Sequence, residues 1–359
     1  MKRPLREQVI VVTGATSGVG RAVARAAGAR GASVVVSGRN AEALEAAVQE
    51  VEAAGGEALA VAAEATSAVD HESLFARAVE RFGRVDSVVC SVMVTVLAEV
   101  EELDSDELRR VLDVNFMGRY HAYRAALPHL QRTRGTFVDV NSGLAYRGIP
   151  LQAAYCASKA AARAFFESAR VEQERHGTGV SVSLVLPGGI NTPQFDRGRQ
   201  KLGFQPQPVP PIYQPEVVAD AILHCCERPE RELPVTWAAQ RLLWGQKLAP
   251  RLGDLWLRRT GWKDQTTGEE KPVTAPDNLY TTVPGDPGAR GRFDARAKGS
   301  SAWTKARLRL GKAGSAAALG APALVVLFGY DGRTKQRRSG STRPHLRSRT
   351  RKVSWRTWN

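Results

Sequence analysis

Short apolar runs alternate with amphipathic stretches along the first 235 of the 359 residues. Such runs predict buried strands, and the stretches between them predict helices. The predicted strands are Val9–Val12, Val34–Val36, Leu59–Val61, Val85–Val89, Thr136–Val140, Val180–Leu186 and Val235–Thr236. A helix is predicted over Ala41–Ala54, where Gly55 and Gly56 end it. This alternation favours an α/β fold, with a doubly wound parallel sheet and helices on both of its faces.

A glycine-rich turn follows the first predicted strand. It reads Thr13-Gly14-Ala15-Thr16-Ser17-Gly18-Val19-Gly20 and leads into a predicted helix over 21–30. Glycine permits positive φ and lets the backbone come close to a phosphate. The amide end of the following helix favours a negative charge. The turn therefore predicts a pyrophosphate-binding site for a dinucleotide.

Two further segments carry reactive side chains, Asn141-Ser142 and Tyr155-Cys156-Ala157-Ser158-Lys159. Tyr155 and Lys159 are four residues apart on a predicted helix and share one face. Together with the glycine-rich turn, these segments resemble the classical short-chain dehydrogenase/reductase family. The later segments 145–150, 210–216 and 277–280 are similar to a bacterial subgroup with an extended C-terminus, and the resemblance covers about residues 5–295. The resemblance implies a Rossmann-type sheet and an oxidoreductase that interconverts a carbonyl and a secondary alcohol.

The resemblance assigns four catalytic residues. Asn115 is expected to hold a water molecule of a proton relay, and Ser142 to bind the substrate oxygen. Tyr155 is expected to act as general acid and base, with its pKa lowered by the Lys159 ammonium and by the oxidised nicotinamide ring. Lys159 is also expected to hold the nicotinamide ribose.

The same resemblance implies a set of cofactor-binding residues along the chain. Glu64 stands where the family commonly has an Asp beside the adenine. Thr192, in the segment Pro187–Thr192, is expected to reach the nicotinamide carboxamide. The full set is Thr13, Gly14, Ser17, Gly18, Val19, Gly20, Arg39, Glu64, Tyr155, Lys159, Pro187, Gly188, Ile190 and Thr192.

The choice of dinucleotide depends on the end of the second predicted strand. NAD-binding relatives carry an acidic residue there, whereas this chain has Ser37-Gly38-Arg39-Asn40. Arg39 can pair with a 2′-phosphate, although it can also be a surface side chain with no ligand. We therefore predict that NADP(H) is preferred and that NAD(H) can also serve.

One segment departs from the family pattern. The NNAG that follows the fourth strand is replaced by Cys90-Ser91-Val92-Met93. Val92 and Met93 could crowd the cofactor ribose, because the backbone passes close to it in the family. The alternative hypothesis is therefore a catalytically weakened dinucleotide-binding sensor or scaffold.

The whole chain divides into four parts: a domain over 1–236, an extension over 237–300, an apolar segment over 301–332 and a tail over 333–359. The proline-bearing stretch 190–215 predicts a substrate lid or a rigid linker. The Trp-bearing stretch 237–262 predicts one or two amphipathic helices that pack on the domain, with a lipid-facing or subunit-facing surface as the alternative. The polar composition of residues 263–300 predicts an extended strap or a disordered linker. Asp277-Asn278-Leu279-Tyr280 is the one apolar segment that could attach it to the domain.

Charge is concentrated at the end of the chain. The net charge is +15, and residues 333–359 hold ten Lys or Arg and no Asp or Glu. A solvated extension is favoured over a tail that binds nucleic acid or anionic lipid. Residues 313–330 are mostly apolar but include Pro322, so surface association or simple disorder is favoured over a membrane span.

The four cysteines show neither metal-ligand spacing nor the density of a disulfide scaffold. No metal site is therefore expected, and a reducing cytoplasm is predicted, with membrane association through 313–330 as a further option. The partners implied by the resemblance are a small carbonyl or alcohol substrate and further copies of the chain in a homodimer or homotetramer. The Trp-bearing and Pro-rich regions suggest that the substrate is apolar.

Overall fold

The computed structural model describes the backbone of residues 2–319, with side chains up to residue 311. Met1–Ala318 form one compact unit that contains both the sheet and the C-terminal extension. The basic tail over 333–359 and residues 320–330 of the apolar run lie outside the described residues. Within the described part, no helix is long and apolar enough to cross a bilayer.

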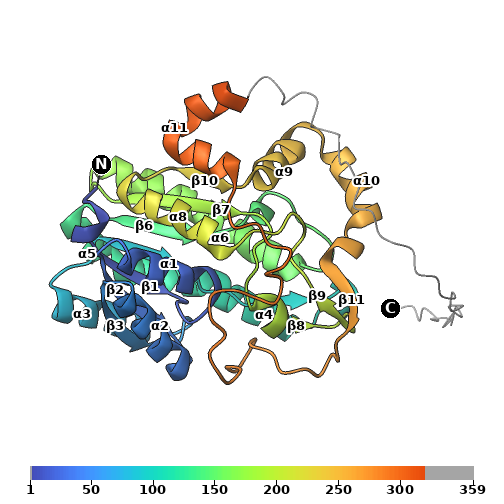
Figure 1. The fold of residues 1–359 in the computed structure, drawn as a ribbon, viewed down its shortest axis with the longest axis horizontal. Helices are drawn as coiled ribbons and strands as arrows, with labels where there is room; N and C mark the ends of the chain where they lie inside the picture. The colour runs from blue at the N-terminus through green and yellow to red at the C-terminus, as the bar shows by residue number, and fades with distance from the viewer. Residues whose placement is uncertain (1, 320–359) are drawn as a thin grey trace, which may run out of the picture. The chain divides into compact units, whose positions relative to one another are not determined.

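The centre of the described unit is a seven-stranded parallel sheet with the order β10-β7-β6-β4-β1-β2-β3 (Figure 1). Its strands are β1 (Val9–Thr13), β2 (Ser33–Gly38), β3 (Glu57–Ala62), β4 (Ser87–Cys90), β6 (Thr136–Val140), β7 (Ser181–Pro187) and β10 (Glu232–Val235). Each of the seven predicted strands is present, and the predicted doubly wound α/β fold is confirmed.

Helices cover both faces of this sheet because successive strand residues point to opposite sides. Ile10 and Val12 pack into one cluster, whereas Val9 and Val11 pack into the other. The first face is covered by α1 (Gly18–Gly28), α2 (Ala41–Ala53) and α8 (Pro215–Glu227). The second is covered by α3 (Ala68–Phe82), α5 (Gly118–Thr133) and α6 (Ala153–Arg175).

The sheet fixes where a ligand can bind. The chain builds outward from β1 to β2 and β3, and then returns to place β4 on the other side of β1. Such a reversal leaves a crevice at the carboxyl ends of the strands, where ligands of open α/β sheets bind. The glycine-rich turn follows β1 at this edge, and Asn141 and Ser142 follow β6.

The stretch 190–215 contains short regular elements rather than a free loop. They are α7 (Gln194–Arg197), β8 (Arg199–Gln200) and β9 (Phe204–Pro206). β8 pairs with β5 (Val96–Leu97), and β9 pairs with β11 (Thr266–Glu270).

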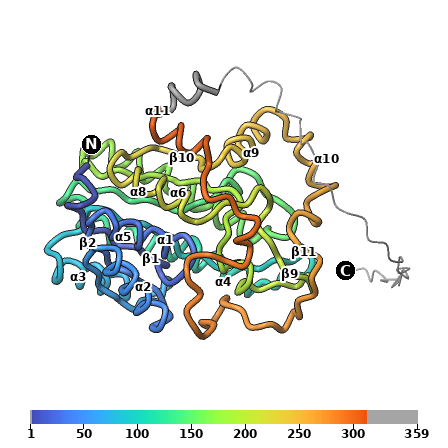
Figure 2. The backbone as a smooth tube through the Cα atoms, viewed as in Figure 1, coloured from blue at the N-terminus to red at the C-terminus, as the bar shows by residue number. Residues whose placement is uncertain are grey.

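The C-terminal extension begins with two helices, as the Trp-bearing stretch predicts. These are α9 (Trp237–Leu248) and α10 (Pro250–Thr260), and the described chain ends in α11 (Ala302–Leu319). Between β11 and α11 the chain forms neither helix nor strand. Figure 2 shows this segment in orange as it leaves β11, loops along the edge of the unit and returns across it toward α11.

Candidate active site

The glycine-rich turn has the geometry that a phosphate site requires. Gly14 adopts a φ of +72°, and a Cβ on Gly20 would lie 2.2 Å from the Gly14 carbonyl oxygen. The first turn of α1 contains no acidic residue, and the Ser17 side chain forms no capping hydrogen bond. The amide end of α1 is therefore suited to an anion such as a pyrophosphate.

The segment that replaces NNAG lies directly against this turn. A Cβ on Gly14 would be 2.8 Å from the backbone nitrogen of Val92. Cys90 is buried at the end of β4 and accepts a hydrogen bond from Thr13 Oγ1 at 3.4 Å. The residues that follow are held by Asn115, whose carboxamide accepts from the Val94 N–H at 2.8 Å and donates to the Val94 carbonyl at 2.9 Å. The altered segment is thus anchored by a side chain that the sequence assigns to the site.

Asn115 lies in a short π-helix, η3 (Asp113–Met117), between α4 (Ser105–Leu112) and α5. Its Nδ2 also donates to Ser158 Oγ at 3.1 Å, which connects it to the helix that bears Tyr155. Its backbone carbonyl accepts a hydrogen bond from Arg119 at 2.6 Å. Asn115 therefore connects the Val94 segment to α6.

The predicted catalytic side chains Ser142, Tyr155 and Lys159 meet at the carboxyl end of β6. Ser142 precedes η4 (Gly143–Ala145) and forms a hydrogen bond with Tyr155. Lys159 Nζ lies 5.5 Å from the centre of the Tyr155 ring. It is buried and donates to the Val140 carbonyl at 2.7 Å. The structure thus brings together a hydroxyl, a phenol and an amine at the same edge of the sheet as the glycine-rich turn.

A buried ion pair that sequence reasoning missed lies behind these residues. Arg119 and Asp139 are 1% and 0% exposed, and Arg119 Nε donates to Asp139 Oδ1 at 2.6 Å. The guanidinium also donates to the carbonyls of Asn115 at 2.6 Å and Val140 at 3.1 Å. Asn141 Nδ2 donates to the second carboxylate oxygen at 2.8 Å. Arg119 therefore fixes two backbone carbonyls of the catalytic region.

The electrostatics of Tyr155 differ from the sequence prediction. Burial raises the pKa of Tyr155 to about 12, against the opposing effects of the Ser142 hydrogen bond and the Arg119 charge. Burial also lowers the pKa of Lys159 well below its usual value, and the nearby Arg119 charge lowers it further. In the structure, Arg119 is therefore the cation that favours the Tyr155 phenolate, and desolvation outweighs it.

Charged residues gather where β2 and β3 end. Arg39 NH1 lies 3.6 Å from Glu64 Oε2, and Arg110 NH2 lies 3.4 Å from Glu64 Oε1. Two cations thus share one carboxylate, which leaves an excess positive charge at the position where the sequence predicts a 2′-phosphate. Arg110 belongs to α4. Nothing in the sequence around Arg110 predicts that it lies beside Glu64.

The loop after β7 faces the glycine-rich turn. Pro187 ends β7, and Gly188 packs next to the Thr236 side chain. Ile190 is buried. A Cβ on Gly18 would lie 3.3 Å from the Thr192 side chain. The cofactor residues predicted after β1, β2, β3 and β7 therefore occupy one edge of the sheet.

A segment of the C-terminal extension, residues 277–294, crosses this edge, and we call it the strap. The carbonyls of Asn278 and Tyr280 accept from the Arg39 guanidinium at 3.1 and 3.3 Å. The Gly288 carbonyl accepts from the Gly18 N–H at 3.1 Å. Leu279, in the apolar hold that the sequence indicates, is fully buried.

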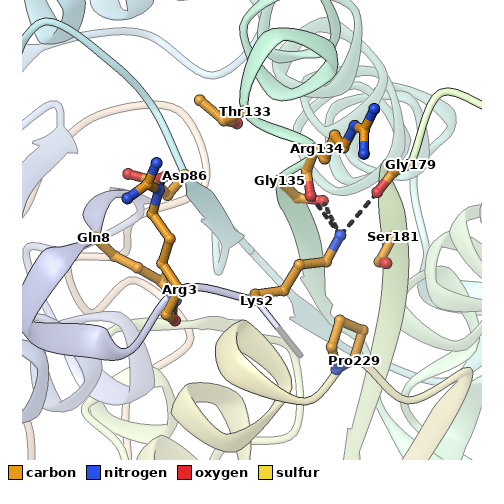
Figure 3. Close-up of a pocket in the computed structure, with 10 residues that line it drawn as sticks. All are labelled: Lys2, Arg3, Gln8, Asp86, Thr133, Arg134, Gly135, Gly179, Ser181 and Pro229. Carbon is orange, nitrogen blue, oxygen red and sulfur yellow. Dashed lines mark hydrogen bonds and ion pairs between the residues drawn. The ribbon is translucent and has the colours of Figure 1, made fainter.

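A pocket lies at the opposite edge of the sheet, near the amino ends of the strands (Figure 3). Lys2 Nζ donates there to the carbonyls of Arg134, Gly135 and Gly179. These contacts satisfy the amine and attach the N-terminal segment to the sheet. Among the described residues, no group of His, Cys, Asp or Glu is arranged to hold a metal ion, and the four cysteines are buried and free.

Comparisons with known proteins agree with this geometry. Residues 8–202 match the sequence profile described as short chain dehydrogenase. The chain is 34% identical over 266 residues to the uncharacterized oxidoreductase YxnA of Bacillus subtilis. This match covers 73% of this chain and 75% of YxnA. The chain is 35% identical to a 3beta-hydroxysteroid dehydrogenase of Mediterraneibacter gnavus over 53% of this chain and 69% of the relative.

A solved structure shows the same fold. It is an alcohol dehydrogenase from the archaeon Thermococcus sibiricus complexed with 5-hydroxy-NADP, with a TM-score of 0.55 and 27% identity. The match covers 63% of this chain and 95% of that structure. The chain belongs to the short-chain dehydrogenase family and is an oxidoreductase of the CH–OH/C=O class that acts with a nucleotide cofactor.

Proposed function

We propose that this enzyme interconverts a carbonyl compound and a secondary alcohol, prefers NADP(H) to NAD(H), and uses Tyr155 as its general acid and base. The observation that carries the proposal is the convergence of Ser142, Tyr155 and Lys159 at the sheet edge that bears the glycine-rich turn. The substrate is a small molecule, and an apolar one is favoured by the Trp- and Pro-rich segments beside this edge.

The residues present fit a bound dinucleotide. The amide end of α1 would hold the pyrophosphate, and Arg39 with Arg110 would face the 2′-phosphate. Thr192 would reach the nicotinamide end. When bound, the cofactor supplies or accepts the hydride.

The protein's own residues handle the proton and the oxygen charge. During carbonyl reduction the Tyr155 phenol would donate its proton to the substrate oxygen as negative charge develops there. The Ser142 hydroxyl would donate a hydrogen bond to the same oxygen and stabilise that charge. Arg119 would keep the Asn115 and Val140 carbonyls in place, and Lys159 would hold the nicotinamide ribose.

Arg39→Ala is expected to weaken NADPH binding by roughly 10- to 100-fold, because a hydrogen bond to a charged group contributes about 1.5–3 kcal/mol. NADH lacks the 2′-phosphate, so its Kd should change little. Parallel fluorescence titrations of the variant and the parent measure both. Arg109→Ala is the matched control, since Arg109 is an exposed arginine of α4 paired with Asp106. An equal loss for NADH and NADPH would contradict the role of Arg39.

We further propose a homodimer or homotetramer formed through α5 and α6. Phe116 of η3 and Tyr120 of α5 both pack edge-on against Phe165 of α6, and all three are partly exposed. Light scattering of the full chain tests this assembly.

A further inference from the structure

The strap follows the same line as the predicted cofactor residues. Near the end of β2, Arg39 and Asn40 donate to strap carbonyls, Asn40 to those of Val283 and Gly285 at 3.4 and 3.1 Å. At the start of α1, the Gly18 N–H donates to Gly288, and Arg21 pairs with Asp286 at 3.3 Å. These contacts lie at the positions predicted for the adenosine and the pyrophosphate.

The strap also reaches the predicted nicotinamide end. A Cβ on Gly291 would lie 2.6 Å from the Thr192 carbonyl oxygen, so the two backbones are in close contact. Asn191 Nδ2 donates to Asp294 at 2.9 Å, and Asn191 Oδ1 accepts from the Phe293 N–H at 3.1 Å. One segment thus contacts the residues predicted for all three parts of the dinucleotide.

The two ends of the strap are more firmly held than its middle. Leu279 is buried in a cluster with Ala65, Val94 and Val114, and its carbonyl accepts from Arg110 at 3.0 Å. Asp277 pairs with Arg199 at 2.8 Å. Between these anchors and Asp294, the middle is attached by hydrogen bonds and by partly exposed ion pairs of Asp286, Arg290 and Arg292. Its one side chain in the hydrophobic core is the small Ala289.

We propose that the strap is a clasp over the dinucleotide site, anchored at Leu279 and Asp294, whose middle must open before the cofactor can enter or leave. The Gly18 N–H at the start of α1, which would face the pyrophosphate, is hydrogen-bonded to the Gly288 carbonyl. The middle of the strap must therefore release this N–H before the pyrophosphate can bind. Gly285 and Gly288 both have positive φ, at +81° and +63°, and their backbone can rearrange with little steric restriction. This proposal rests on the proposed function, because it assumes that the site binds a dinucleotide.

Stopped-flow fluorescence of the full chain with NADPH tests the clasp. If opening precedes binding, the observed rate of the parent should level off at high NADPH concentration. Leu279→Ala removes the buried anchor and should raise this plateau about tenfold or more. Val273→Ala is the matched control, because Val273 is 56% exposed upstream of the strap, and it should behave as the parent.

Asp277→Asn loosens the same anchor without creating a cavity and should shift the plateau in the same direction. Hydrogen exchange distinguishes local release from misfolding, since only peptides over 277–294 should exchange faster in the two anchor variants. A parent rate that rises linearly without a plateau, with the same slope in Leu279→Ala, would overturn the clasp. If no dinucleotide binds to any variant, the proposed function fails, while exchange of the strap still reports its attachment.

A different observation concerns α9 and α10, which lie at the rim of the unit (Figure 1). Five large apolar side chains are exposed there and form what we call the hairpin face: Trp244, Leu248, Leu252, Leu255 and Trp256. Leu248 is 76% exposed, whereas Leu243 and Leu257 on the same helices are buried. The pair of helices therefore packs with one side and presents apolar groups on the other.

The stretch that carries the hairpin face is also rich in exposed cations. The exposed ones are Lys247, Arg251, Arg258, Arg259 and Lys263. The exposed carboxylate in this stretch, Asp254, is paired with Arg147 at 2.5 Å. A second copy of the chain on this face would bring like charges together, whereas an anionic bilayer matches both the charge and the Trp and Leu side chains.

We infer that the hairpin face docks on the surface of an anionic bilayer. The buried side of α9 packs on η4, where a Cβ on Gly143 would lie 3.3 Å from Leu242. Since Gly143 follows Ser142, docking would bring the substrate side of the site close to lipid. That consequence rests on the proposed function, whereas the docking itself does not.

Flotation of the full chain with vesicles of phosphatidylglycerol and phosphatidylcholine, at about 3:7, tests the docking. The double variant Leu252→Ser/Trp256→Ser should bind about tenfold less than the parent. Val69→Ser/Val100→Ser is the matched control, since these valines are 72% and 70% exposed elsewhere, and it should bind as the parent does. All three proteins carry the same basic tail, so its contribution cancels.

Two results would overturn the docking. One is equal flotation of the double variant and the parent. The other is a parent dimer, seen by light scattering without vesicles, that the double variant converts to a monomer, because the occupant would then be a second copy of the chain.

Discussion

Tyr155→Phe is expected to lower kcat for carbonyl reduction by roughly 10²- to 10⁴-fold, the range typical of a lost general acid. The phenol is the group next to Ser142 that can donate a proton to the substrate oxygen. NADPH binding should be nearly unchanged, because the ring itself is retained. Steady-state kinetics over a panel of carbonyl substrates, together with a fluorescence titration, measure both quantities.

Tyr123→Phe is the matched control, because Tyr123 is a buried tyrosine of the aromatic cluster between α5 and α6. It should keep the parental kcat. The pH dependence gives a second readout. With a pKa of about 12, Tyr155 stays protonated between pH 6 and 9, so it should add no pH dependence to carbonyl reduction, whereas alcohol oxidation should accelerate as pH rises. A parental kcat in Tyr155→Phe would contradict the assignment.

Arg119→Met is expected to lower the free energy of unfolding by about 3–5 kcal/mol, because it leaves the carboxylate of Asp139 buried without its cation. It also removes the donors to the Asn115 and Val140 carbonyls, so activity should fall with stability. Urea denaturation followed by circular dichroism measures the loss.

The double variant Arg119→Met/Asp139→Asn removes both charges and should recover a large part of the stability. Arg109→Met is the surface control, since its ion pair with Asp106 is exposed and should contribute no more than about 1 kcal/mol. A double variant no more stable than Arg119→Met would show that the buried charge is not the cause of the loss.

Local sequence patterns were sufficient for the sheet and for the glycine-rich turn. Runs such as Val9–Val12 are buried on both faces, which is why they are continuously apolar rather than alternating. The turn is set by backbone requirements at Gly14 and Gly20 that few other residues meet. Both signals lie within one short segment and need no information from distant residues.

The features that the sequence did not reveal depend on distant pairs. In the sequence, Arg119 resembles a surface residue of a helix. Only the structure shows that it is buried against Asp139, 20 residues away. Arg39 meets Tyr280 across a separation of 241 residues. The apolar hold at Leu279 could be recognised in the sequence, but its partners could not, because no periodicity in the strap indicates where it lies.

The altered segment Cys90–Met93 illustrates the same limit. From the sequence it is a loss of two amides and a glycine, which motivated the scaffold alternative. In the structure its backbone runs against Gly14, and the next residues are held by Asn115. These hydrogen bonds come from a residue more than 20 positions away, beyond the reach of a local motif.

The most direct test of the proposed NADP(H)-dependent activity is a fluorescence titration of the full-length protein with NADPH and NADH in parallel. We expect saturable binding of both, with NADPH bound roughly tenfold or more tightly through Arg39 and Arg110. Failure to bind either dinucleotide would contradict the proposed function, and equal affinity for the two would contradict the preference for NADP(H).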